Sequence, residues 1–232
     1  NIVFKRSSDL ELKRLYEDII DLRMAVSYPF LLKIHHDCAE GLITLDELKD
    51  ILKLSVSYVL RRAICEIPTN SMNKTFATFK NYIKPDDYLN SVKAFFVMQD
   101  TYKEFPDDDK FESTFTSRDI YNMRARNYIL SRLENFENKA PIVIENYTIE
   151  HILPQNKNLS PEWQVDLGAD WKEIQKKYLH TIGNLTLTAY NSEMSDRSFM
   201  EKMNMKGGFK ESALRLNRYV VLQNVWNEQH IQ

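Results

Sequence analysis

The sequence predicts a mainly helical protein: a helical bundle over residues 1–138, then a small α+β unit over residues 139–232. Only five of the 232 residues are glycine, so the chain has few of the positive-φ positions that tight-turned sheet proteins use. In the first part, apolar residues recur at helical spacing. From Pro141 the pattern changes to β-branched residues that partly alternate, which is typical of an extended segment.

The helices of the first part follow from this spacing. The first runs from Leu10 to Val26, and a second apolar run follows at residues 30–34. Thr44 and Glu47 have the spacing of a capping box, which predicts the start of a long helix that ends before Pro68. The same period predicts the remaining helices at residues 72–84, 86–99 and 117–136.

The second part is expected to contain two short strands. One lies within residues 141–154 and the other at residues 184–188. A polar loop at 155–160 and a short amphipathic helix at 170–178 are expected between them. A helix starting near Asn191 should follow, with Phe199 and Met203 on its buried side, and residues 219–232 have the pattern of a final helix.

The composition limits the classes of function. The chain has 31 Lys and Arg against 33 Asp and Glu, so no global cationic field indicates a polyanionic partner, and any nucleic-acid contact must be local. Cys38 and Cys65 lie within apolar helical patterns, which favours buried thiols over a disulfide framework or a metal cluster and predicts a cytoplasmic protein.

The sequence also predicts that the protein does not enter a membrane. Its apolar runs are all shorter than the roughly 18 to 20 residues that a membrane span needs. The chain starts with Asn1 and has no signal-peptide pattern, so we expect it to be a piece of a longer protein.

Glu150 and His151 are the first candidates for chemistry. They lie next to each other near the end of the first predicted strand, where Pro154 gives the strand a reason to stop. An imidazole is largely neutral near pH 7 and can take a proton from water, which suits general-base catalysis. Taken alone, however, a histidine here is more often a partly buried structural residue.

Further motifs follow in order downstream of His151. They are His151-Ile-Leu-Pro154, Leu179-His-Thr-Ile-Gly-Asn-Leu-Thr-Leu-Thr188, Tyr190-Asn191-Ser192, and Ser198-Phe199 with Lys202. Together they resemble the HNH, or His-Me finger, endonucleases, and most closely the C-terminal domain of GmrSD-type, modification-dependent restriction endonucleases. The resemblance extends upstream, through Tyr28-Pro29 and Arg126 to Glu134, and covers most of the chain.

The resemblance implies a ββα-metal fold and a role for each matching residue. His151 would be the general base that activates water against a phosphodiester of DNA. Glu150 and Asn191 would be ligands of one Mg²⁺ or Mn²⁺ ion, hard cations that bind oxygen and keep several waters. Asn184 would hold the loop and orient the imidazole, and we expect a structural role for His180 at the entry to the second strand.

Two features depart from the pattern of the HNH name. The third motif position is Asn191 instead of histidine, which is ordinary for this subfamily. The zinc-binding cysteine pairs of some HNH domains are absent, because the two cysteines lie far upstream. We therefore expect the finger to be braced by apolar packing through Trp163, Trp171 and Trp226.

Local charge suggests where DNA would bind. Residues 197–218 contain six basic residues against two acidic ones, and Arg197 and Lys202 are the first candidates for phosphate contacts. A surface helix also carries such residues without binding DNA.

The resemblance further implies a defence role against phage DNA, often with modified bases. Members of the family commonly carry or pair with an N-terminal, nucleotide-hydrolysing sensor domain, which this chain lacks; it also has no P-loop motif. The alternative is a catalytically silent module, in which the helical bundle docks the sensor domain and the finger only binds DNA. The complete set of Glu150, His151, Asn184 and Asn191 favours the enzyme.

Overall fold

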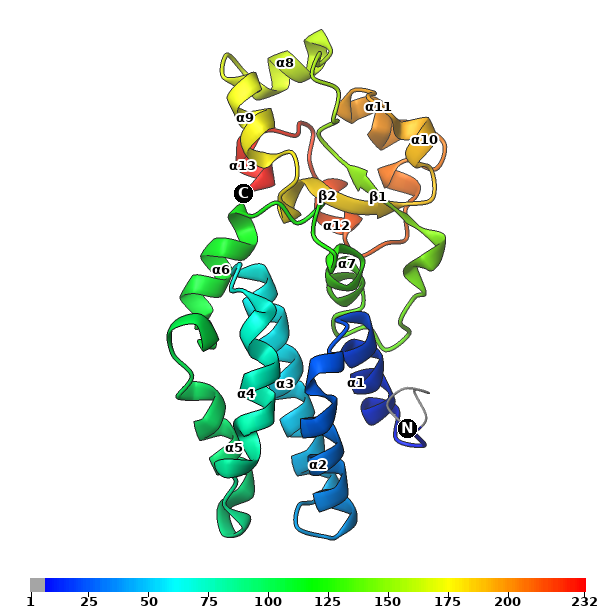
Figure 1. The fold of residues 1–232 in the computed structure, drawn as a ribbon. Coiled ribbons are helices and arrows are strands. Elements are labelled where there is room, and N and C mark those ends of the chain that lie inside the picture. Colours follow the sequence, from blue (N-terminus) through cyan, green and yellow to red (C-terminus); the bar gives the residue numbers. More distant parts are fainter. Residues whose placement is uncertain (1–6) are drawn as a thin grey trace. The chain divides into compact units, whose positions relative to one another are not determined.

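The computed structural model describes residues 7–232 and divides the chain into two compact units, Asn1–Thr114 and Phe115–Gln232 (Figure 1). The first six residues, with which the predicted bundle opens, lie outside the described residues. The boundary between the units falls inside the helix Asp108–Ser117, earlier in the chain than the expected boundary at residue 138. Residues 115–138 therefore belong to the second unit.

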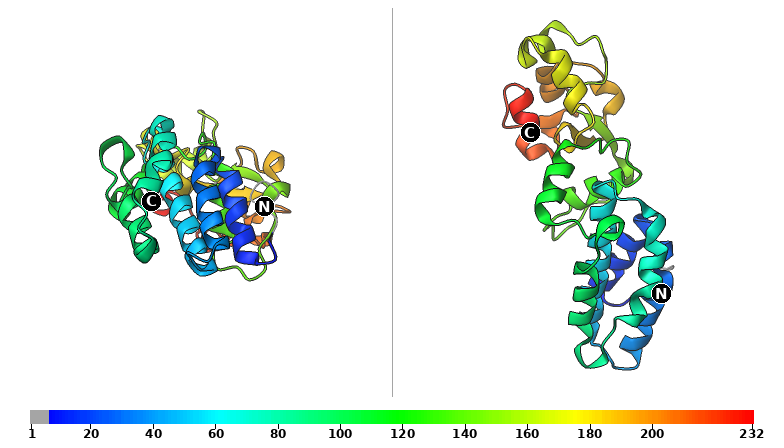
Figure 2. Two further views of the ribbon diagram at one scale, coloured as in Figure 1. Left: turned by 60° about the horizontal axis from the view of Figure 1, so that its bottom comes forward. Right: turned by 60° about the vertical axis from the view of Figure 1, so that its left-hand side comes forward.

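The first unit is helical, as its periodicity predicts. Its helices are α1 (Leu10–Asp21), α2 (Tyr28–Ala39), α3 (Leu45–Ile64), α4 (Met72–Thr78) and α5 (Tyr88–Val97), with α6 (Asp108–Ser117) at its end. Helix α3 contacts α1, α2 and α5, and α2 also contacts α4. Figure 2 shows this blue-to-green group of helices from two further directions.

Helix α3 begins where the capping box predicts. The Thr44 hydroxyl accepts from the Glu47 backbone N–H at 3.2 Å, and the Glu47 carboxylate accepts from the Thr44 N–H at 2.8 Å. These bonds satisfy N–H groups that the first turn of a helix otherwise leaves without partners. The helix buries its apolar face in an aromatic core, where Tyr58 packs against Phe76 and Phe96.

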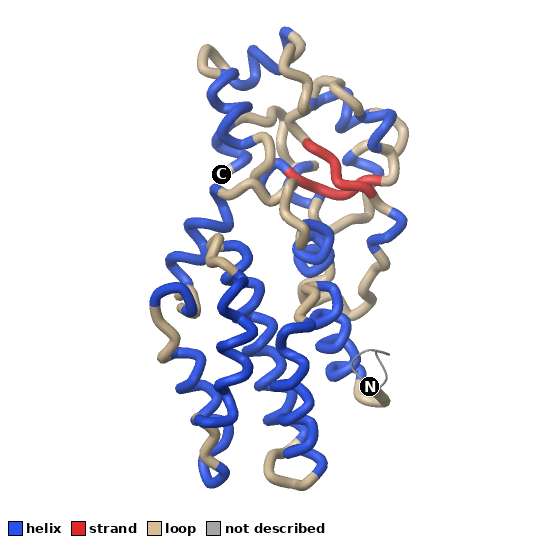
Figure 3. The backbone as a smooth tube through the Cα atoms, in the orientation of Figure 1, coloured by secondary structure: helices blue, strands red, loops and turns tan. Residues whose placement is uncertain are grey.

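The second unit contains one antiparallel pair of strands surrounded by short helices (Figure 3). Strands β1 (Thr148–His151) and β2 (Leu185–Thr188) pair with Glu150 opposite Thr186 and His151 opposite Leu185. The helices are α7 (Arg126–Glu134), α8 (Pro161–Leu167), α9 (Trp171–Tyr178), α10 (Asn191–Met194), α11 (Phe199–Asn204), α12 (Asn217–Val220) and α13 (Glu228–Ile231). The two expected strands and the helix expected at 170–178 are confirmed.

The core of the second unit is built around two tryptophans. Trp163 and Trp226 are fully buried and both contact Phe199, while Trp171 packs against the same cluster from a partly buried position. Phe199 and Met203 are buried, as expected, although they lie on α11, which is separate from the helix that begins at Asn191. Apolar packing thus braces this unit.

Two expected helices are interrupted. The helix expected over 117–136 breaks at residues 118–125, because the backbone N–H groups of Ile120 and Tyr121 donate to the carbonyl of His180. The final helix expected over 219–232 is replaced by α12, a turn, and α13, which starts at an Asn227 cap. Among residues 7–232, no helix is both long enough and apolar enough to cross a membrane.

Candidate active site around His151

His151 lies at the end of β1 with only 4% of its surface exposed. Successive side chains of a strand point to opposite faces, so His151 shares a face with Ile149, and Glu150 points the other way. The general base and the metal ligand that the resemblance places next to each other therefore start from opposite sides of the sheet.

The loop after β1 is held by Asn184, which is completely buried. Its side-chain oxygen accepts from the Leu153 N–H at 2.7 Å, and its side-chain nitrogen donates to the carbonyls of Leu153 and Leu179 at 3.0 Å each. The amide thus joins the chain that follows His151 to the chain that precedes β2. These are the contacts of a residue that holds the loop and keeps the His151 backbone in place.

The imidazole of His151 is paired with a second imidazole. Its Nε2 lies 3.0 Å from Nδ1 of His180, which stands just before the entry to β2. Only one of two facing neutral ring nitrogens carries a proton, so one ring donates and the other accepts. His180 therefore fixes the orientation of His151 as well as contributing a backbone carbonyl to Ile120 and Tyr121.

Tyr121 completes an aromatic cluster with the two histidines. Its ring stacks on His180 with a centroid distance of 5.2 Å and an interplanar angle of 12°, and it meets the His151 ring edge-on at 4.4 Å. The three rings restrict one another to the observed rotamers. The cluster explains why His151 is so little exposed.

Burial lowers the pKa of His151 to about 4, and the neighbouring His180 and Lys202 act in the same direction. Asp119 opposes this shift. Burial alone would raise the pKa of Asp119. Hydrogen bonds from Asn122 and the electrostatic effect of the nearby His180 nevertheless hold this pKa below its usual value. His151 is therefore neutral at pH 7, with a carboxylate close to its partner ring.

Glu150 is engaged by Lys202. The Lys202 ammonium is fully buried and donates to the Glu150 carboxylate at 2.5 Å and to the carbonyls of His151 and Ile152 at 2.8 and 3.1 Å. Burial raises the pKa of Glu150 although Lys202 lowers it, and burial lowers the pKa of Lys202 although Glu150 raises it.

Three acceptors around one ammonium satisfy Lys202 and leave it no exposed donor. The structure therefore does not support the expected phosphate contact of Lys202. Its role is to fix the backbone at the end of β1. The Glu150 carboxylate is likewise already paired with a cation, the Lys202 ammonium.

Asn191, the first residue of α10, lies on the other side of the hairpin. Its side-chain nitrogen donates to the carbonyl of Ile149 at 2.6 Å. It borders a cavity of about 630 Å³ between α7, β1 and α10, which we call the α7–α10 cavity. The residues that line this cavity include Tyr121, Arg126, Asn127, Ile149, Asn191 and Ser192. Tyr121, which lines the cavity, also contacts the His151 ring.

The donors at this site fit a metal ion only in part. Among residues 7–232, no three His, Cys, Asp or Glu side chains are grouped so that they could hold a metal. Glu150 does not fit as a ligand while Lys202 occupies its carboxylate. Asn191 fits as an oxygen ligand, because its nitrogen is the amide atom bound to Ile149 and its oxygen remains.

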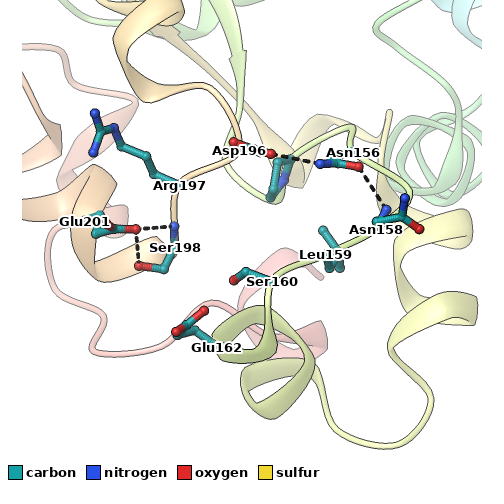
Figure 4. Close-up of a pocket in the computed structure, with 10 residues that line it drawn as sticks. Asn156, Asn158, Leu159, Ser160, Glu162, Asp196, Arg197, Ser198 and Glu201 are labelled. Carbon is teal, nitrogen blue, oxygen red and sulfur yellow. Dashed lines mark hydrogen bonds between the residues drawn. The ribbon is translucent and has the colours of Figure 1, made fainter.

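Arg197 lies in a different cavity, of about 440 Å³ (Figure 4). The side chain is exposed and its Nε donates to the carbonyl of Glu193 at 2.8 Å. The lining of this cavity also contains Glu162, Asp196 and Glu201. The lining thus holds three carboxylates against one arginine, and their negative charge repels phosphate, so the surroundings of Arg197 are less favourable for DNA than the sequence suggests.

The structure thus places the Asn184 amide on the backbone of the loop that follows His151, and it places Glu150 with Lys202 in a separate, buried ion pair. One functional candidate, Tyr121, was not identified from the sequence, and a second, His180, was noted as able to reach the site but was given a structural role. Tyr121 lies in a segment where periodicity predicts a helix, so no pattern marked it. His180 was expected to be structural, and only its place beside Gly183-Asn184 hinted that its ring reaches the site.

Comparison with known proteins identifies the family. The family model for the C-terminal domain of GmrSD restriction endonucleases matches residues 105–232, which include α7, the hairpin and every residue of the site. Neither the curated proteins nor the solved structures contain a significant match. Since the matched segment spans more than half of the chain, the protein belongs to the GmrSD family of restriction endonucleases.

Proposed function

We propose that the second unit hydrolyses DNA phosphodiester bonds, with His151 as the general base. The observation that carries this proposal is the pairing of the two imidazoles at the end of the hairpin, 3.0 Å apart. Membership of a restriction endonuclease family supports a nuclease, and the HNH type of chemistry is our inference from the position of His151.

The hydrogen bond determines which nitrogen acts. Because Nε2 of His151 is bound to His180, Nδ1 is the nitrogen that receives the proton from water. In the tautomer that this requires, Nε2 of His151 carries the hydrogen and donates a hydrogen bond to Nδ1 of His180. When Nδ1 takes up a proton, His151 becomes positively charged, and the carboxylate of Asp119 beside the pair stabilises that charge.

The water attacks phosphorus, the bond to the leaving oxygen breaks, and negative charge builds on that oxygen. A divalent cation, Mg²⁺ or Mn²⁺, would supply stabilisation of this charge, and in our proposal the side-chain oxygen of Asn191 would hold it. Glu150 could join this set only if Lys202 released it. Asn184 keeps the imidazole in place through the backbone of Leu153.

We further propose that the substrate is phage DNA, often modified, and that recognition of the modification resides in a sensor domain outside this chain. Arg197 remains a candidate DNA contact of minor weight, because three carboxylates share its cavity. The other candidate function, a silent docking and DNA-binding module, is favoured by the low exposure of His151.

Plasmid nicking by the chain with Mg²⁺ or Mn²⁺ tests the proposal. We expect metal-dependent nicking that His151→Ala abolishes, while His36→Ala, an exposed histidine in the first unit, has no effect. Asn191→Ala should raise the metal concentration needed for half-maximal rate. Equal nicking by the protein and its His151→Ala variant would contradict the role of His151 as the base, and no nicking by either protein with any tested metal would favour the silent module.

A further inference from the structure

The α7–α10 cavity contains a single charged group. Among the described residues that line it, Arg126 alone carries a charge, and the other polar groups are amides and hydroxyls. The cavity around Arg197, by contrast, contains three carboxylates. Of the two cavities, the one beside the histidine pair is thus the one whose charge attracts an anion.

Arg126 is held in a defined position. Its Nη1 donates to the carbonyl of Tyr121 at 2.8 Å, and its guanidinium carbon lies 5.2 Å from the centre of the Tyr121 ring. One of five guanidinium donors is used in this bond, so the group can still bind two oxygens of one phosphate. Stacking on the Tyr121 ring already restricts the Arg126 side chain, so binding a phosphate costs less conformational entropy.

Arg126 is also close to the proposed base. The Tyr121 ring that supports the guanidinium contacts the His151 ring at 4.4 Å, so one side chain connects the two. Asn191, which also lines the cavity, donates to the backbone carbonyl of Ile149, two residues before His151. An anion beside Arg126 would therefore lie near the atoms that carry out the proposed reaction.

From these contacts we infer that the α7–α10 cavity binds the DNA backbone and that Arg126 contacts a phosphodiester there. This inference rests on the proposed function, which it deepens by naming a substrate-binding residue. One arginine with uncharged amides and hydroxyls suits a phosphodiester, which carries a single negative charge, better than a di- or triphosphate, which needs several cations.

The test measures binding without cleavage. Full-length His151→Ala chain is titrated onto fluorescein-labelled duplex DNA in EDTA, and anisotropy gives the affinity at several salt concentrations. Adding Arg126→Ala should weaken binding roughly tenfold and reduce the slope of log affinity against log salt by about one. Arg124→Ala is the matched control, because Arg124 is exposed on the same segment and does not line the cavity.

A second variant covers the case in which Arg126→Ala does not fold. Asn127→Asp adds a carboxylate to the cavity wall without changing the side-chain shape, at an exposed site in the first turn of α7 where an acid is tolerated. It should weaken binding several-fold, whereas Asn224→Asp, exposed elsewhere in the unit, should not.

Unchanged affinity in both cavity variants, equal loss in the Arg124 control, or no DNA binding by the chain would overturn the inference. Binding that depends on Arg126 in a chain that never cleaves DNA would instead support the cavity and contradict the nuclease. The two proposals can therefore fail separately.

Discussion

Nε2 of His151 and Nδ1 of His180 lie 3.0 Å apart, so each imidazole fixes the orientation of the other. His180 thereby becomes a positioning residue for the proposed base. Substitutions of groups that orient a reactive side chain typically cost 10- to 100-fold.

We accordingly expect His180→Ala to reduce the cleavage rate by roughly 10- to 100-fold with little change in KM, because the substrate contacts remain. Single-turnover and steady-state cleavage assays separate the two parameters. His180→Asn, which keeps a hydrogen-bonding group at this position, should recover part of the rate. A loss seen only in KM would contradict the positioning role.

The low pKa of His151 predicts that stability depends on pH. Its pKa is about 4 in the folded protein and 6.5 by reference, so the unfolded chain binds more protons between these values. The contribution of His151 to the free energy of unfolding is fully present above pH 6.5 and is lost as the pH falls toward 4. Most of the loss, about 2 kcal/mol, falls between pH 7 and pH 5.

Urea titrations followed by tryptophan fluorescence measure this loss, because all three tryptophans lie in the second unit. A His151→Asn variant lacks the imidazole and should show a correspondingly smaller difference between pH 7 and pH 5. An identical pH dependence in both proteins would show that His151 is not the group responsible.

The buried ion pair predicts a large effect of removing one partner. Lys202→Met leaves the Glu150 carboxylate buried without its cation and should lower the free energy of unfolding by about 3–5 kcal/mol. Lys206→Met, at an exposed site, is the control. In the double variant Glu150→Leu, Lys202→Met, the loss should be smaller than the sum of the single losses. Additive losses would contradict a direct pairing.

Asn184 makes three hydrogen bonds to backbone atoms of Leu153 and Leu179, and the two to Leu153 are buried. Asn184→Ala leaves these groups unsatisfied and should cost about 3 kcal/mol of unfolding free energy in denaturant titrations. It should also slow cleavage, because the chain after His151 loses its support. Asn204→Ala, at an exposed position, should do neither, and an equal effect of both substitutions would argue against the anchoring role.

The sequence predicts local structure well wherever one side chain and its near neighbours decide it. Thr44 and Glu47 interact within a single helical turn, and the alternation of residues 185–188 identifies β2 directly. The break after Ser117 could not be predicted in this way, because the carbonyl that binds Ile120 and Tyr121 comes from His180, far along the chain.

The site shows the same limit. The alternation of a strand already predicts that the adjacent residues Glu150 and His151 point to opposite faces, but the sequence does not show that Glu150 meets Lys202, 52 residues away. The positive charge of Lys202 was visible in the sequence and its burial was not. The bonds of Asn184 to Leu153, 31 residues earlier, were equally invisible in the local pattern, and only the resemblance suggested that this residue holds the loop.

Chemical rescue tests the role of His151 most directly. His151→Ala removes the imidazole and leaves a cavity next to His180, into which free imidazole can bind. If His151 is the general base, this variant does not cleave DNA in Mg²⁺ or Mn²⁺, and added imidazole restores cleavage in proportion to its concentration. Cleavage by the variant at the wild-type rate without imidazole would contradict this role.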